Sequence, residues 1–421
     1  MADMNKTILF VDQYVGSALK SAKNYFGEKT KILLLRDISH KPHDGKKEFR
    51  YADEVIYVDF AKPYDIASAL VPYQSSLIAV TARTEEGANK LRAVIPHVPY
   101  LRTPTQESIL WSTDKYEMRR RFKLYDPAIT PKFTKVKGNT KEERNRIIQK
   151  IKFPMVVKPA NLQESMLVTI CYHEEELERT LKNVFRRLQA EYTKYNRAQL
   201  PTIIAEQFMD GEMYSVDAYV NSRGKVYFCP FVHIKTGRNI GHDDFYNYLQ
   251  VTPTLLKKRS TERAQEVAEK AVHALGLRSI TAHIELMRID DEWKVIEVGP
   301  RVGGFRDTLH KLSCDIDHSL NDVLIRIPKN PIIPKRCKGH AAAMKWFAKS
   351  EGVILAMNGV KKLESLESFH SIVFNKKVGD KALLSKNGGK SIFNLILYNA
   401  DHSKLLADIR RVEQMVKIKV K

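Results

Sequence analysis

Two glutamates stand at matching positions in a segment that could do chemistry, namely HIELMRIDDEWKVIEV, residues 283–298. The segment reads as two strands joined by a short acidic loop, because both arms are rich in apolar and β-branched residues. With the loop centred on Asp291, Glu285 lies opposite Glu297 and both side chains point to one face. A two-residue loop would instead shift the register and separate the two glutamates.

Two carboxylates facing each other at about 5 Å destabilise a sheet, and their burial adds to the cost. A hard divalent cation removes the conflict, because it takes carboxylate and phosphate oxygens together. The alternative is that one glutamate is exposed, or is paired with Arg301 or Arg306. We favour the cation, and predict Glu285 and Glu297 as ligands of Mg²⁺ (or Mn²⁺).

The sequence PRVGG, residues 300–304, follows the second glutamate. Gly303 and Gly304 allow a ligand to approach the backbone closely. Arg301 and Arg306 can each place two hydrogen bonds on a phosphate or a carboxylate. These four residues are therefore predicted to contact the substrate.

A polar loop at residues 233–250, HIKTGRNIGHDDFYNYLQ, interrupts an otherwise core-forming region. Loops of this kind often carry functional residues. Lys235 could reach a phosphate, the alternative being a plain surface lysine. His242 could contact an amino-acid-like substrate, the alternative being a solvated loop.

The elements around these motifs indicate an α/β chain followed by an α+β unit. Residues 6–110 alternate short apolar runs with helical stretches, which predicts a parallel sheet covered on both faces. This region has no G-x-G-x-x-G motif, so a dinucleotide site is not indicated. The three prolines in residues 326–339 indicate a linker, and residues 338–421 read as short strands with a final helix.

The chain has 421 residues and a formal net charge of +21, which is unevenly spread. Residues 331–421 hold 18 lysines and arginines against 7 acidic residues. Such a surface favours anionic partners, although a solvated basic surface is the simpler interpretation. Nucleic acid binding through this region stays a lesser alternative, because the sequence has no aromatic RNA-binding signature.

The four cysteines, Cys171, Cys229, Cys314 and Cys337, contain no C-x-x-C spacing. Scattered cysteines predict reduced, buried thiols, with neither a disulfide framework nor a zinc site. No apolar run approaches the roughly 20 residues that a membrane helix needs, and the N-terminus lacks the features of a signal peptide. We therefore expect a cytoplasmic protein with no membrane contact.

Taken in order, these motifs resemble the ATP-grasp superfamily over about residues 5–330. The resemblance implies an N-terminal Rossmann-like pre-ATP-grasp domain at 1–111 and an ATP-grasp domain at 112–330. The second domain would have a smaller lobe at about 125–205 and a metal- and substrate-binding lobe at about 206–330. Residues 331–421 look like the small α+β domain of amino-acid ligases.

The resemblance also implies a nucleotide site. STDKYEMRRRF places Lys115 near the phosphates of ATP, and FPMVVKPA supplies Lys158 as the phosphate-binding lysine. IIAEQFMDGEMYSVDAYV is similar to the hinge that clasps adenine. The residues it would contribute are Glu206, Gln207, Phe208, Met209 and Glu212. Lys158 and Arg301 would be the catalytic residues.

Three departures from the family pattern are visible. The loop NLQESMLV, residues 161–168, has no glycine, although Ser165 could still donate to a phosphate. Met213 stands where the family has a ribose-binding glutamate. Gly299 stands where the family has an asparagine that completes the metal shell, so that ligand would have to come from water or the substrate.

The implied reaction is ATP- and Mg²⁺-dependent joining of a carboxylate to an amine through an acyl phosphate, on small amino-acid-like substrates. One alternative is a degenerate ATP-grasp module that binds nucleotide and regulates a partner, and the three departures favour it. Another is a carboxylating or nucleotide-biosynthesis enzyme of the same superfamily. A homodimer is left open by the sequence.

Overall fold

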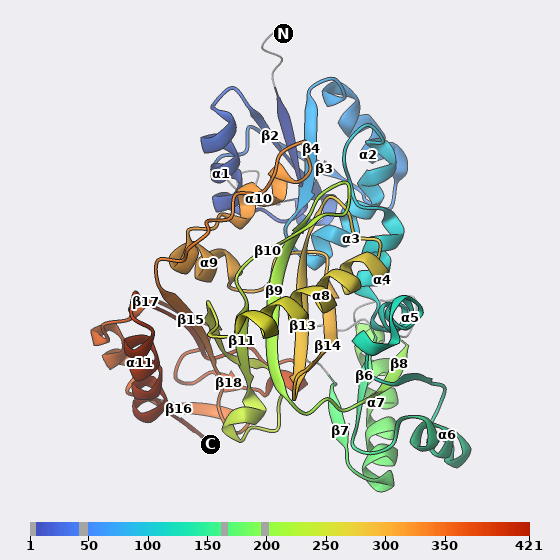
Figure 1. Cartoon of the computed structure of the whole chain (residues 1–421), viewed down its shortest axis with the longest axis vertical. Helices are drawn as coiled ribbons and strands as arrows, with labels where there is room; N and C mark the ends of the chain where they lie inside the picture. The colour runs from blue at the N-terminus through green and yellow to red at the C-terminus, as the bar shows by residue number, and fades with distance from the viewer. Residues whose placement is uncertain (1–5, 42–48, 161–166, 195–201) are drawn as a thin grey trace.

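The computed structural model describes residues 6–41, 49–160, 167–194 and 202–421. An N-terminal α/β unit lies at one end of the molecule, and a small lobe and the C-terminal residues lie on either side of a central sheet (Figure 1). Ser165 and most of the glycine-free loop lie outside the described residues. Among the described helices, none combines the length and the apolar character needed to cross a membrane.

The N-terminal unit is a parallel sheet in the order β3-β2-β1-β4. Alternate residues of β1 are buried in different cores, with Ile8 against α1 and α10 and Leu9 in the large core that also includes α3. Strand β1 is therefore buried along its whole length, as expected for a parallel sheet covered on both faces. The elements are β1 (Thr7–Val11), β2 (Lys31–Asp37), β3 (Glu54–Val58), β4 (Leu77–Ala82), α1 (Gly16–Phe26), α2 (Pro63–Leu70), α3 (Glu85–Val94) and α4 (Gln106–Thr113).

The small lobe is an antiparallel sheet in the order β5-β8-β6-β7, backed by two amphipathic helices. Leu177, Leu181 and Val184 recur at helical spacing along one helix and pack on Val157 and Ala205 of the sheet. The elements are α5 (Lys115–Tyr125), β5 (Phe133–Val136), α6 (Lys141–Ile151), β6 (Met155–Pro159), β7 (Thr169–Cys171), α7 (Glu174–Lys194) and β8 (Ile203–Gln207).

The central sheet has the order β14-β13-β9-β11-β12-β15-β19-β17, with β10 paired to β9. One face of β13 is apolar and packs under α8, which crosses the sheet in Figure 1. The elements are β9 (Glu212–Val220), β10 (Val226–Phe228), β11 (Val232–Thr236), β12 (Asn247–Thr252), α8 (Lys258–Ala274), β13 (Ile280–Ile289), β14 (Glu292–Gly299), α9 (Arg306–Cys314) and α10 (His318–Leu324).

The C-terminal residues continue this central sheet rather than forming a detached unit. Strand β15 pairs antiparallel with β12, so hydrogen bonds of the sheet cross the expected boundary at residue 330. A smaller sheet, β18-β16-β20, and α11 cover this end. The elements are β15 (His340–Trp346), β16 (Gly352–Asn358), β17 (Phe369–Phe374), β18 (Lys381–Ala382), β19 (Phe393–Asn399), α11 (His402–Met415) and β20 (Lys417–Val420).

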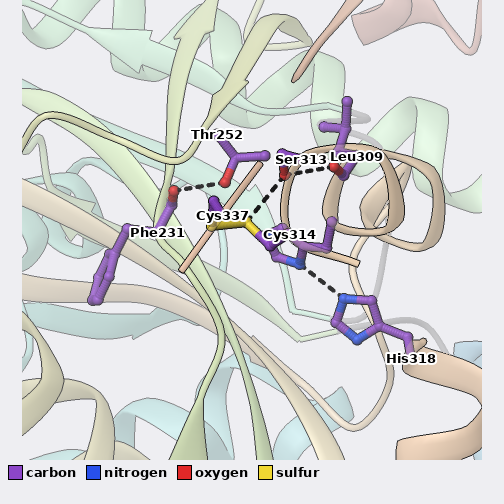
Figure 2. The surroundings of a disulfide bond; sticks show 8 residues. Phe231, Thr252, Leu309, Ser313, Cys314, His318 and Cys337 are labelled. Carbon is purple, nitrogen blue, oxygen red and sulfur yellow. Dashed lines mark hydrogen bonds between the residues drawn. A yellow bond between two sulfur atoms is a disulfide. The ribbon is translucent and has the colours of Figure 1, made fainter. Parts of the chain in front are cut away.

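A disulfide joins Cys314, at the end of α9, to Cys337 in the proline-rich segment (Figure 2). The prediction of four reduced thiols is therefore wrong for this pair. The two cysteines become neighbours only in the folded chain. There the backbone N–H of Lys338 donates to the Ser313 carbonyl at 2.6 Å and holds the two segments together. Cys171 and Cys229 are free and buried, as predicted.

Candidate active site

A cavity of about 1940 Å³ lies where the N-terminal unit, the small lobe and the central sheet meet. Residues from the C-terminal strands line part of it. The predicted phosphate and metal residues also line it, namely Lys115, Lys158, Glu285, Glu297 and Arg301. Residues that lie far apart in the sequence therefore share one space.

The hairpin of β13 and β14 brings the two glutamates face to face. Glu285 pairs directly with Glu297 in the ladder, as predicted. The turn nevertheless has two residues, Asp290 and Asp291, which shifts the register next to it. A bulge between Glu285 and Leu286 then restores the pairing, because Ile296 is the extra residue on β14.

Cations surround this pair of carboxylates. The Lys115 ammonium lies 3.1 Å from Glu297 Oε1, and His283 Nε2 lies 3.5 Å from Glu285 Oε1. Burial alone would raise the pKa of Glu285, but His283 and Arg301 outweigh it and the pKa is lowered. Burial likewise lowers the pKa of Lys115, yet Glu297 and its other acidic neighbours raise it overall. The site therefore holds charged groups of both signs.

Lys158 belongs to a buried ion network that the sequence did not reveal. Its ammonium lies 2.7 Å from Glu206 Oε2, and Arg119 Nε donates to Glu206 Oε1 at 2.7 Å. Burial opposes ionisation of Glu206, but the two cations outweigh it and lower its pKa to about 2. Burial also lowers the pKa of Lys158, with Glu206 acting against that effect.

The contacts of Glu206 differ from the prediction, in which its side chain contacts adenine. Both carboxylate oxygens are occupied by Arg119 and Lys158, and the residue is 3% exposed. The backbone N–H groups of Gln207 and Phe208 also donate within the protein, to Lys132 and Pro154. Gln207, Phe208 and Met209 do line the cavity, immediately before β9.

Of the remaining predicted site residues, Glu212 and Lys235 line the cavity and His242 does not. Glu212 lines the cavity, accepts a hydrogen bond from Tyr214 at 3.2 Å and lies 3.4 Å from Arg288. Lys235 is exposed and also lines the cavity. His242 is not among the lining residues, and its Nδ1 is hydrogen-bonded to Tyr246 Oη at 2.9 Å. The structure therefore brings Glu212 and Lys235 to the cavity and leaves His242 outside it.

Arg301 points toward the N-terminal unit. Its Nε lies 3.6 Å from Glu85 Oε2, and Glu85 occupies the first position of α3, after the N-cap residue Thr84. Glu85 is buried and also raises the pKa of Lys115. The sequence motifs missed Glu85, although the Thr-Glu-Glu start of a helix was visible.

Arg306 is held in the protein rather than free to fork onto a substrate. It is 1% exposed, its Nε lies 3.2 Å from Asp217, and it donates to Ser215 Oγ at 2.7 Å. It also donates to Gln250. The substrate role predicted for its guanidinium therefore does not fit, because these partners on neighbouring strands occupy it.

Asp217 is the centre of this buried network and was missed by the sequence reasoning. It accepts the Gly303 N–H at 2.7 Å and lies 3.2 Å from His283 Nδ1. Burial opposes its ionisation, but His283 and Arg306 hold its pKa well below the usual range. Gly303 must be small here, because a Cβ would lie 2.4 Å from His283 Nδ1, whereas Gly304 faces open space.

Comparison with known proteins finds a family match within the chain. Residues 151–309 match the ATP-grasp domain family. The alanine–anticapsin ligase of Bacillus amyloliquefaciens is 28% identical over 204 residues, or 46% of this chain and 42% of that protein. The formate-dependent phosphoribosylglycinamide formyltransferase of Wolinella succinogenes is 28% identical over 163 residues, 38% of each chain. The matches thus span less than half the length of these curated relatives.

Solved structures match over nearly the whole chain. An L-amino acid ligase from Bacillus licheniformis has a TM-score of 0.79 at 18% identity and covers 100% of both chains. A phosphoribosylglycinamide synthetase from Anaerococcus prevotii has a TM-score of 0.65 at 19% identity, covering 99% of this chain and 100% of its own. Likeness at such identities establishes the fold, so the predicted fold class is confirmed. Residues 151–309 of the chain thus match the ATP-grasp domain family, and the whole chain has the fold of the L-amino acid ligase structure.

Proposed function

We propose that the protein is an ATP- and Mg²⁺-dependent ligase that joins a carboxylate to an amine, acting on amino-acid-like substrates. The observation that carries this proposal is the facing pair Glu285 and Glu297, with Lys115 and Lys158 lining the same cavity. Among the relatives, alanine–anticapsin ligase supports the carboxylate–amine class.

The donor set fits a hard divalent cation. Two carboxylates on adjacent strands repel each other, and the basic side chains of Lys115 and His283 now lie beside them. Glu285 and Glu297 would hold Mg²⁺, with phosphate oxygens and water as the other ligands. Bound there, Mg²⁺ would supply charge neutralisation on the transferring phosphoryl group. Gly299 offers no side chain, so a further ligand must come from elsewhere.

The two lysines have different parts in this proposal. Lys158 is fixed by Glu206 at the cavity wall, which places its ammonium for a phosphate oxygen without a search among rotamers. Lys115 is held by Glu297, so it can turn from that carboxylate to the triphosphate when the cation takes its place. Glu206 thus acts as a positioning residue for Lys158.

The chemistry needs orientation and charge more than a protein base. A substrate carboxylate oxygen attacks the terminal phosphorus of ATP and ADP leaves, giving an acyl phosphate. The amine then attacks the acyl carbon and inorganic phosphate leaves. Arg301, held by Glu85 at the cavity wall, is the residue that would stabilise the negative charge of the phosphoryl group.

The size of the cavity supports more than one ligand. Its volume of about 1940 Å³ exceeds the roughly 300–1,000 Å³ of an ordinary small-molecule pocket. The N-terminal unit contributes Arg36 and Arg92, and the C-terminal strands contribute Lys345 and Phe347. These walls would enclose the carboxylate and amine substrates beside the nucleotide.

A nucleotide-biosynthesis enzyme of the same superfamily is the second candidate. It is favoured by the likeness to phosphoribosylglycinamide formyltransferase and synthetase. A phosphoribosylated amine as the required substrate would distinguish it from an amino-acid ligase. A nucleotide-binding regulator would bind ATP but release no phosphate with any substrate pair.

The test is phosphate release over pairs of amino acids, with Mg²⁺ and ATP. Turnover that needs both a carboxylate and an amine, and that is lost in Glu297→Gln, supports the proposal. Glu292→Gln is the matched control, because Glu292 is exposed at the start of the same strand. Wild-type protein that releases no phosphate above background with any pair would end the amino-acid ligase proposal.

A further inference from the structure

Three side chains with metal-binding atoms meet in a buried cluster outside the candidate active site. Cys229 follows β10, His310 lies on α9, and His318 is the first residue of α10. One ligand atom from each lies within 4.8 Å of the others. All three residues are at most 3% exposed, so surface chemistry does not explain their gathering.

The two imidazoles already face each other. His310 Nδ1 and His318 Nε2 are 2.8 Å apart. Tyr219 Oη is hydrogen-bonded to the other nitrogen of His318, at 2.7 Å. The His310 ring also contacts the backbone of Pro230, the residue after Cys229.

Burial has opposite effects on the pKa values of the two kinds of side chain. It lowers the pKa of His310 and His318, against the opposing effect of Asp217. Burial raises the pKa of the Cys229 thiol, so a metal would displace a proton as it binds.

We propose that Cys229, His310 and His318 form a binding site for Zn²⁺ or a transition metal of similar ligand preference. Two imidazoles and a thiolate are the ligand types that such metals favour. Ligand atoms around a tetrahedral ion with bonds of about 2.0–2.3 Å lie roughly 3.3–3.8 Å apart. The observed limit of 4.8 Å therefore requires the outermost ligand atoms to approach by at most about 1.5 Å, while the two imidazole nitrogens, now 2.8 Å apart, would separate by about 0.5–1 Å.

The surroundings already supply the outer contacts of such a site. The Tyr219 hydroxyl at His318 Nδ1 fixes the ring and leaves Nε2 toward the cluster. A metal here would tie α9 and α10 to the segment after β10. Helix α9 begins at Arg306, which is bonded to Asp217 and Ser215 in the active-site wall. The site would therefore be structural, holding that wall in place.

The test uses the purified full-length protein and Co²⁺ as the spectroscopic probe. We expect about one equivalent of Zn²⁺ per chain in the protein as isolated, measured by elemental analysis. Co²⁺ replacing it should give the charge-transfer absorption of a cobalt–thiolate bond. Cys229→Ser should remove that absorption and weaken binding at least about tenfold. Cys171→Ser, a buried free cysteine in the small lobe, should change neither.

A second variant keeps the result interpretable if Cys229→Ser folds poorly. His310→Gln preserves volume and should lose the metal while circular dichroism remains that of the wild type. Protein that carries no transition metal and gives no cobalt–thiolate absorption would overturn the proposal. So would metal binding that persists in both Cys229→Ser and His310→Gln. Metal content is independent of phosphate release, so this outcome leaves the ligase proposal untouched.

Discussion

Replacement of Glu206 by glutamine tests whether a buried ion network positions the phosphate-binding lysine. The change leaves Arg119 and Lys158 as buried cations without their carboxylate. Breaking a buried pair in this way costs roughly 3–5 kcal/mol of unfolding free energy. The pKa of Glu206, about 2 against an ordinary 4.5, gives a similar figure of about 3 kcal/mol.

The same shift fixes the pH at which the effect is seen. Because folding lowers the pKa of Glu206, its contribution to stability is fully present above about pH 4.5. It is lost as the pH falls from there toward about 2. The Glu206→Gln protein should therefore show a smaller loss of stability across this acid range than the wild type shows.

The assay is urea denaturation at several pH values, combined with ATP binding by calorimetry. Glu178→Gln is the control, because Glu178 pairs with Arg144 at 3.3 Å on the surface of the same lobe. Glu178 is exposed although Arg144 is half-buried, and such a partly exposed pair contributes roughly 0–1 kcal/mol. Loss of Glu206 also removes the carboxylate that raises the pKa of Lys158. ATP binding by the Glu206→Gln protein should therefore weaken more at high pH than ATP binding by the wild type. Equal stability losses in the two variants would refute the reasoning.

Two glycines near the metal hairpin give further predictions. Gly299→Asn should fold normally, because the nearest atom to its new Cβ is Arg301 Cγ at 3.8 Å, and its side-chain oxygen should tighten Mn²⁺ binding in a titration. Gly303→Ala should lose roughly 1–3 kcal/mol in chemical denaturation, since its Cβ would press on His283. Gly304→Ala should stay within about 0.5 kcal/mol, since it meets open space. Weaker Mn²⁺ binding in the first case, or equal losses in the other two, would contradict these expectations.

The hairpin of β13 and β14 shows which features of the site the sequence alone predicts. Alternation along the two arms predicted that Glu285 and Glu297 share a face, and the structure has them paired. The expected turn was wrong in length, and a bulge at Ile296 compensates for it. Alternation shows which face a side chain takes, but a bulge depends on the local twist and packing of the sheet.

Partners from distant parts of the chain could not be predicted in the same way. Arg306 was assigned to a ligand because a guanidinium suits phosphate or carboxylate, and Glu206 because its segment resembles the adenine-binding hinge of the family. Their buried partners, Asp217 and Arg119, lie 89 and 87 residues away and become neighbours only in the folded chain. The disulfide between Cys314 and Cys337 likewise joins residues that become neighbours only in the folded chain. Residue type indicates what a side chain can bind, whereas the fold decides what it does bind.

The central claim is that Glu285 and Glu297 together hold a divalent cation against the phosphates of ATP. Calorimetric titration of Mn²⁺ into the protein with a non-hydrolysable ATP analogue measures this directly. Glu285→Gln and Glu297→Gln should each weaken Mn²⁺ binding at least about tenfold, while Glu292→Gln leaves it unchanged. Wild-type affinity in both glutamine variants would contradict the account.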